Sequence, residues 1–204
     1  MVEKIREKQS VRKRGKTMDQ RNDSVKNIVV VAFFAAVTYL GIQVFRIPIP
    51  AAVGTPFLHF GNIFVVLGIL FLGGRRGAVS GTLGLLIFDL LNGYIHAMPK
   101  IFIVTILKCL VLGWLFSYLN RKHSQGKHAE YRNAVVVTAA YVLLTLLLEF
   151  VAGTIELLIA GSVFQGAIAA SFSPLPATAI NGIFTLVGVG AAYIPLRRAL
   201  KKVL

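Results

Sequence analysis

Long runs of apolar residues, separated by short stretches that are polar or rich in glycine and proline, dominate the chain. A helix needs about 20 mostly apolar residues to cross the hydrocarbon core of a bilayer, with a range of about 17–25. Runs of this length predict an all-α integral membrane protein, a bundle of six transmembrane helices. The predicted segments are Asn27–Phe45, Phe57–Leu72, Ala78–Tyr94, Ile101–Leu119, Asn133–Ala160 and Ala177–Leu196.

Composition and charge agree with this class and add an orientation. The chain of 204 residues is 56% hydrophobic and only 15% charged, as in membrane proteins. All but three of its 22 Lys and Arg lie in the N-terminal arm, the turn GGRRG, the loop 121–132 and the C-terminal tail. With six crossings these places share one side, so the positive-inside rule predicts that both termini are cytoplasmic.

Two parts follow from this pattern. We expect residues 1–26 to form a basic cytoplasmic N-terminal arm and residues 27–204 to form a six-helix membrane domain. The net charge of +14 would also suit a nucleic-acid tail. A topology signal that touches anionic lipid accounts for the charge without nucleic acid.

Polar and ionisable side chains interrupt the apolar segments on the half that faces outside. An ionisable residue in a membrane costs several kcal/mol unless it is paired or hydrated. The pattern therefore predicts a polar cavity open to the outside. A structural ion pair between Lys108 and Glu149 is the alternative, and both can hold. The interrupting residues are His59, Asn62, Asp89, Asn92, Lys108, Glu149, Glu156 and Asn181.

Small residues recur at helical spacing in two segments. Ala32 and Ala36 share one face of the first segment, which is suited to packing within the bundle or to docking a partner helix. Gly77, Gly81 and Gly84 share one face of the third segment and predict a close contact between helices.

The loops and the missing motifs complete the pattern. The stretch RIPIPAAVGTPF has three prolines and is predicted to be a non-helical lid over the cavity. The stretch SVFQGAIAASFSPLP is a candidate second flap. No nucleotide-binding, hydrolase or metal motif is found. An integral-membrane enzyme that uses Asp89, Lys108 and Glu149 on a lipid substrate, or a scaffolding membrane protein, remains an alternative function.

The central third of the chain resembles the substrate-binding S components of energy-coupling factor (ECF) vitamin transporters. The residues that carry the resemblance are FLHFGN, LFLGGRRGAVSGTLG, FDLLNGY and the run from PK to TILK. The subpattern looks closest to S components for vitamin B6 or hydroxymethylpyrimidine. Asn62 stands where an aspartate is common in the family.

The resemblance implies a multi-pass protein of the bacterial cell membrane, not an enzyme, that captures a water-soluble vitamin from outside. Its partners would be a transmembrane coupling protein, docked on Ala32 and Ala36, and two ATPase subunits. ATP would be used by those subunits, so no cofactor is expected in this chain. Vitamin B6, such as pyridoxine, is favoured because a surplus of acid suits a neutral or weakly cationic ring; hydroxymethylpyrimidine, riboflavin, pantothenate and thiamine are alternatives. The predicted binding residues are Phe57, His59, Asn62, Asp89, Asn92, Tyr94, Lys100, Lys108, Glu149 and Asn181.

Overall fold

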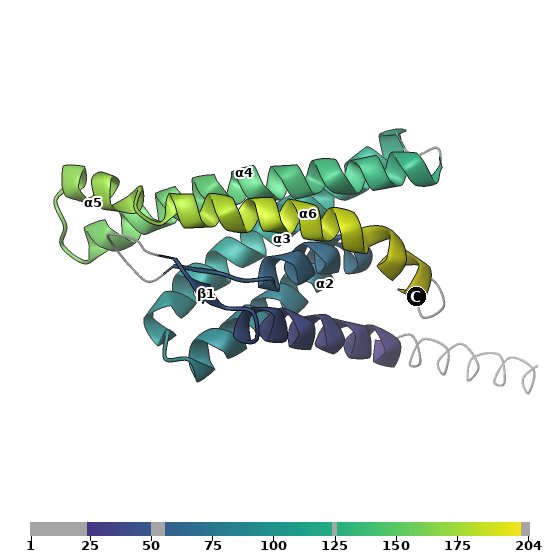
Figure 1. Ribbon diagram of the computed structural model, residues 1–204, viewed down its shortest axis with the longest axis horizontal. Helices are drawn as coiled ribbons and strands as arrows, with labels where there is room; N and C mark the ends of the chain where they lie inside the picture. The colour runs from purple at the N-terminus through teal and green to yellow at the C-terminus, as the bar shows by residue number, and fades with distance from the viewer. Residues whose placement is uncertain (1–23, 50–55, 124–125, 201–204) are drawn as a thin grey trace, which may run out of the picture.

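The computed structural model describes residues 24–49, 56–123 and 126–200, and it is a bundle of helices (Figure 1). Five helical stretches of the described chain are long and apolar enough to cross a membrane. The predicted all-α membrane class is therefore confirmed. The helices are the N-terminal helix Ser24–Gln43, α2 Gly61–Leu91, α3 Met98–His123, α4 Lys127–Ile159, α5 Phe164–Ser171 and α6 Leu175–Leu200, with a short 3-10 helix, η1 Ile95–Ala97, before α3.

The long element α2 folds back on itself at Gly73. This residue has φ 81° and ψ 169°, a conformation that glycine adopts without the steric cost of a Cβ atom. A Cβ built on Gly77 would lie only 2.7 Å from the Cα atom of Ile69. A Cβ on Gly81 would lie 3.0 Å from a methyl carbon of Val65. Residues 61–72 and 74–91 therefore pack against each other as an antiparallel pair.

The glycine face of the third predicted segment makes the expected close contacts. Gly77 and Gly81 face residues 61–72, as described above. Gly84 faces the N-terminal helix, where a Cβ would lie 2.6 Å from the carbonyl oxygen of Ala35. The predicted close packing is confirmed, and it joins three helical segments.

Contacts tie the remaining helices into one bundle. Helix α2 packs against α3 and α6, while α4 packs against α3, α5 and α6. The N-terminal helix begins, and α6 ends, at the same end of the bundle (Figure 1). At this end Arg76 donates a hydrogen bond of 2.8 Å to Asn27, and Arg197 pairs with Glu130.

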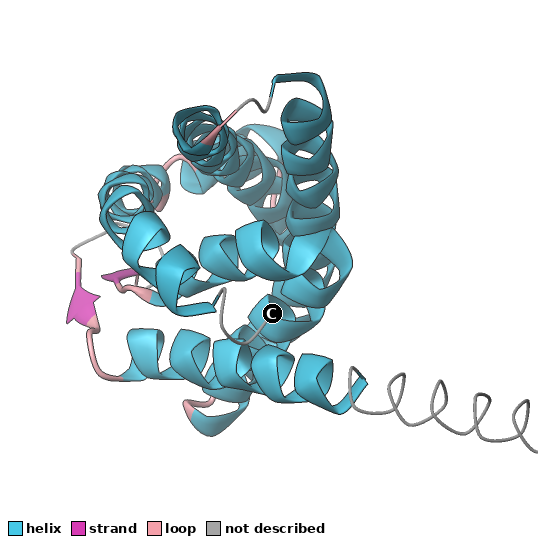
Figure 2. Cartoon of the chain, turned by 90° about the vertical axis from the view of Figure 1, so that its right-hand side faces the viewer, coloured by secondary structure: helices cyan, strands magenta, loops and turns pink. Residues whose placement is uncertain are grey.

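The connections at the opposite end differ in part from the expectation. The proline-rich stretch forms two-residue antiparallel strands, β1 Ile47–Pro48 and β2 Phe57–Leu58, which lie at the edge of the bundle (Figure 2). Its residues 50–55 lie outside the described residues. The stretch SVFQGAIAASFSPLP, predicted as a flap, contains the helix α5. Most of the predicted basic arm, residues 1–23, is also outside the described part.

The turn of α2 packs so closely on α3 that adding one methyl group at the contact is expected to destabilise the protein. A Cβ on Gly113 of α3 would lie 2.2 Å from the Cα atom of Gly74. We expect Gly113→Ala to lower the free energy of unfolding by about 1–3 kcal/mol, because the backbones must move apart. Chemical unfolding of the purified protein in detergent measures this change.

Gly153 of α4 provides the matched control. Its Cβ would lie 3.6 Å from the hydroxyl oxygen of Ser171, an ordinary contact. Gly153→Ala should therefore leave stability unchanged or raise it by up to about 1 kcal/mol through helix propensity. Equal effects of the two substitutions would contradict the close packing of the α2 turn on α3.

Candidate functional site

A cavity of about 160 Å³ lies among the starts of α2, α3 and α6 and the second half of α4. It is therefore near the end of the bundle opposite to the one where the N-terminal helix begins and α6 ends. Five of the predicted binding residues line it, and each comes from a helix or from the residues just before it. The lining residues are His59, Asn62, Leu85, Ile101, Val104, Thr105, Lys108, Thr145, Glu149, Thr178 and Asn181.

Lys108 is the most deeply buried charged group in the cavity wall, with 5% of its surface exposed. Its ammonium nitrogen lies 3.4 Å from the hydroxyl oxygen of Thr145 and 5.0 Å from the centre of the Tyr141 ring. The ring face attracts a cation. An ammonium group offers three donor hydrogens, so these contacts leave hydrogen-bonding capacity directed at the cavity.

Glu149 lines the same cavity but does not pair with Lys108. The ion pairs of the described residues are Lys100–Glu156 and Arg197–Glu130. The alternative of an ion pair between Lys108 and Glu149 is thus wrong, while the predicted polar cavity is present and both residues line it. The wall therefore offers a donor cation and an acceptor carboxylate that do not neutralise each other by contact.

Asn181 and His59 hold the start of α2 over the cavity. The Asn181 side chain accepts a hydrogen bond from the His59 backbone N–H at 2.9 Å and donates one to the Phe57 carbonyl at 2.8 Å. His59 Nδ1 in turn accepts from the backbone N–H of Gly61 at 3.2 Å. His59 therefore both accepts from the first residue of α2 and lines the cavity. Because Nδ1 accepts, its neutral ring carries the proton on Nε2 and can donate it to a ligand.

The side chain of Asn62 is oriented by Tyr141 of α4. Its side-chain oxygen accepts a hydrogen bond of 3.0 Å from the hydroxyl group of Tyr141. Tyr141 is almost completely buried and also carries the Lys108 ammonium over its ring. One tyrosine thus positions two residues of the cavity wall.

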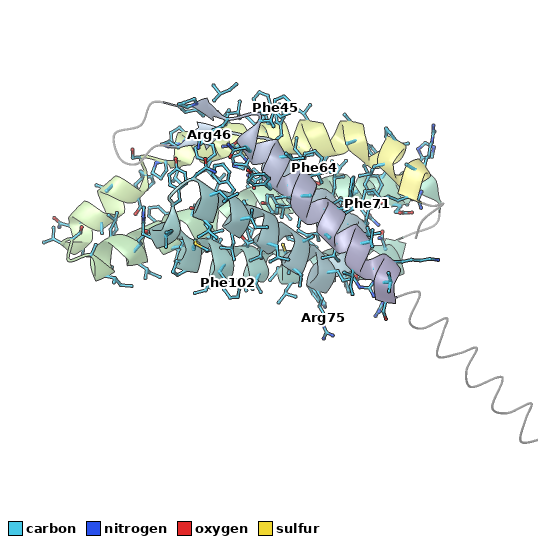
Figure 3. All side chains as sticks on the ribbon, turned by 90° about the horizontal axis from the view of Figure 1, so that it is seen from below. Phe45, Arg46, Phe64, Phe71, Arg75 and Phe102 are labelled. Atoms are coloured by element: carbon cyan, nitrogen blue, oxygen red, sulfur yellow. The ribbon has the colours of Figure 1, made fainter. Side chains whose placement is uncertain are left out.

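Three other predicted binding residues, Phe57, Asn92 and Tyr94, lie in a neighbouring cluster outside this cavity. The rings of Phe57, Phe88 and Tyr94 lie within 6.5 Å of one another, centre to centre. The Arg46 guanidinium lies 5.5 Å from the centre of the Phe57 ring and 5.7 Å from that of Phe88. Arg46 also donates to Asn92 at 3.4 Å. Figure 3 shows Arg46 at the end of the N-terminal helix, next to Phe45.

Asp89 and Lys100 lie near the cavity without lining it. Asp89 is 5% exposed, and its Oδ2 atom has no hydrogen-bond partner among the described residues. Leu85, one helical turn before it, lines the cavity. The Lys100 ammonium lies 2.9 Å from Glu156, an ion pair that joins the start of α3 to the end of α4. The predicted set therefore divides between the cavity wall and the structure around it.

Three threonines of the cavity wall, Thr105, Thr145 and Thr178, were not predicted from the sequence. Most threonine hydroxyls in these helices donate to a carbonyl four residues earlier, as Thr38 and Thr138 do. The hydroxyl group of Thr145 instead accepts a hydrogen bond from the Lys108 ammonium group. Its spacing of four residues from Glu149 puts both on one helix face, which is a signal that the sequence does contain.

The chemistry of the wall is that of a binding site. Ammonium, imidazole and hydroxyl groups donate, while a carboxylate and an amide accept. Among the described residues no group of three or more His, Cys, Asp or Glu side chains could hold a metal ion. The arrangement can hold a small polar solute at several points at once.

His59 gives a pH test of this geometry. It precedes the membrane-spanning helix, and burial, together with the charge of Lys108, lowers its pKa from 6.5 to about 4. Between these values the unfolded chain binds more protons, so His59 makes stability rise with pH over this window and adds nothing above it. We expect the wild type to lose stability relative to His59→Gln as the pH falls from 6.5 to 4, measured by unfolding in detergent.

If the free energy of unfolding of the wild type and of His59→Gln changes by the same amount between pH 6.5 and pH 4, the lowered pKa of His59 is contradicted.

Comparison with known proteins completes the description of the site. The family model described as ECF-type riboflavin transporter, S component, matches residues 22–202, a range that includes every residue of the cavity wall. No curated protein matches the chain significantly. The S component is the substrate-binding subunit of a transporter and not an enzyme, so the lipid-enzyme alternative falls away. The chain is a multi-pass protein of the cell membrane and belongs to the ECF-type riboflavin transporter S component family.

Proposed function

We propose that this chain captures a small water-soluble vitamin from outside the cell in the cavity between α2, α3, α4 and α6. The observation that carries the proposal is the presence of Lys108 and Glu149 in one cavity wall without an ion pair between them. A buried cation costs free energy, and a ligand that accepts from Lys108 and donates to Glu149 would offset that cost.

Vitamin B6, such as pyridoxine, is the substrate that we favour. The cavity of about 160 Å³ is small beside the range of about 300–1,000 Å³ that is usual for ligand sites. A single six-membered ring with hydroxyl substituents suits this size and the mixed donors and acceptors. Hydroxymethylpyrimidine has similar dimensions. Riboflavin, with three fused rings and a ribityl chain, would require the wall to move, as would thiamine with two rings, and pantothenate lacks a ring.

The chain in this proposal crosses the membrane six times, with both termini in the cytoplasm. The reversal at Gly73 supports two crossings within α2. The basic residues support the orientation because Arg76 bonds to the start of the N-terminal helix and Arg197 pairs with the start of α4. The cavity then opens toward the outside, beneath the segment Phe57–Leu58 that Asn181 holds.

Delivery across the membrane would be driven by partners. A transmembrane coupling protein and two ATPase subunits would associate with the chain, and ATP would be used in those subunits. The exposed face of the N-terminal helix supports a docking surface. Ala32 and Ala36 are exposed there, and the flanking Val29, Phe33 and Leu40 are each at least half exposed.

A panel of labelled vitamins tests the proposal on the purified chain. Equilibrium binding of pyridoxine, hydroxymethylpyrimidine, riboflavin, pantothenate and thiamine should give one ligand that binds well below micromolar concentration. Trp114 does not line the cavity; it is 67% exposed and stacks on Tyr118. Its fluorescence is therefore a poor reporter of binding, which is measured by calorimetry or filtration instead. Absence of binding for the whole panel would favour the scaffold alternative.

The two charged residues of the wall should control the affinity. We expect Lys108→Ala and Glu149→Gln each to weaken binding of that vitamin at least tenfold, about 1.4 kcal/mol, because each removes a charge-assisted hydrogen bond. The matched control is Arg121→Ala, which removes an exposed cation near the end of α3, away from the cavity, and should leave the affinity unchanged. Wild-type affinity in both cavity variants would place the site elsewhere.

The docking surface has its own test. Ala32→Trp combined with Ala36→Trp should block uptake by cells, because the larger side chains prevent close approach of a partner helix, while vitamin binding to the isolated chain persists. Leu143→Trp, at an exposed position of α4, is the control and should leave uptake unchanged. Normal uptake by the double variant would remove Ala32 and Ala36 from the docking surface.

A further inference from the structure

A second hollow lies on the outside of the bundle, away from the vitamin cavity. It is an apolar groove of about 410 Å³ between residues 74–91 of α2 and the first half of α3. Among the described residues its polar lining is limited to Arg75 and Thr82. The apolar walls include Val79, Leu83 and Leu86 from α2, and Phe102, Ile106 and Leu110 from α3.

The length of the groove corresponds to one leaflet of a bilayer. Arg75 and Leu86 mark its extent along α2. At 1.5 Å per residue this distance is about 16 Å, which is about half of the hydrocarbon core of about 30 Å. A groove of this length, open on the side of a membrane protein, matches an extended acyl chain that ends near the midplane.

The polar end of the groove carries a cation, Arg75, that has no partner among the described residues. Arg75 is exposed and makes no hydrogen bond, ion pair or ring contact with any described residue. Its neighbour Arg76, by contrast, donates to Asn27. Figure 3 shows the Arg75 side chain pointing away from the bundle, on the same edge as Phe102. A guanidinium group binds phosphate with two parallel hydrogen bonds.

We propose that this groove is a binding site for an anionic phospholipid. One acyl chain lies along the apolar walls, and the phosphate group pairs with Arg75. An anionic head group is preferred over phosphatidylcholine because the choline cation opposes the charge of Arg75. The site is independent of vitamin binding. In the orientation proposed above, Arg75 lies at the cytoplasmic side, so the groove would lie in the cytoplasmic leaflet.

Native mass spectrometry of the full chain in detergent tests the proposal. Phosphatidylglycerol and phosphatidylcholine with identical acyl chains are added at equal concentration. We expect the wild type to retain at least fivefold more phosphatidylglycerol, and Arg75→Gln to reduce this preference to near unity. The matched control Arg76→Gln should keep the preference. Equal retention of both lipids by the wild type, or an unchanged preference in Arg75→Gln, would overturn the proposal.

The acyl-chain part of the site is tested separately. Leu83→Trp places a large ring in the groove and should lower retention of both lipids, while a thermal unfolding scan reports whether the variant is folded. If it is not folded, the comparison of Arg75→Gln with Arg76→Gln decides. Vitamin binding measured on the same samples should be unchanged in Arg75→Gln, so failure of the lipid site and failure of the vitamin site are distinguishable.

Discussion

The buried ammonium group of Lys108 is the constraint around which the polar interior is arranged. A charge within a helical bundle in a membrane must find polar partners or water. Here it finds the hydroxyl of Thr145 and the ring of Tyr141, and Tyr141 in turn donates to Asn62. These contacts use only part of the hydrogen-bonding capacity of Lys108, whose side chain also lines the cavity.

Around this interior the rest of the chain provides a close-packed frame. The reversal at Gly73 and the contact of Gly113 with Gly74 bring α2 and α3 together at the end of the bundle where the N-terminal helix begins. The other end is held by hydrogen bonds of Asn181 and by the pair Lys100–Glu156, which surround the cavity. The frame is thus closely packed at the end where the N-terminal helix begins and α6 ends, and it holds a cavity near the opposite end. This arrangement suits a subunit that captures a solute at one face and contacts partners elsewhere.

Much of this fold could be predicted because apolar length and glycine spacing are local properties. The run lengths gave the membrane helices, and the spacing of Gly77, Gly81 and Gly84 gave a face that packs closely. The helix α5 was missed because an eight-residue apolar stretch next to prolines carries too little periodicity. Most residues of the cavity wall that were predicted are polar groups in apolar segments, for which burial has an evident cost. The threonines of the wall were missed because a threonine in a helix usually satisfies itself on its own backbone. Asp89 and Asn92 were predicted to line the cavity because they lie at a similar depth in the membrane. They do not line it, since the direction of a side chain depends on the rotation of each helix about its own axis.

The central claim is that Lys108 is kept for the ligand and not for the fold. The most direct test is the free energy of unfolding of ligand-free Lys108→Met, compared with that of the wild type in the same detergent. Replacement of a poorly compensated buried charge by an apolar side chain of similar length is often neutral or stabilising. The account predicts equal or higher stability for Lys108→Met. A loss of about 3 kcal/mol or more, the size expected when a buried structural pair is broken, would contradict it.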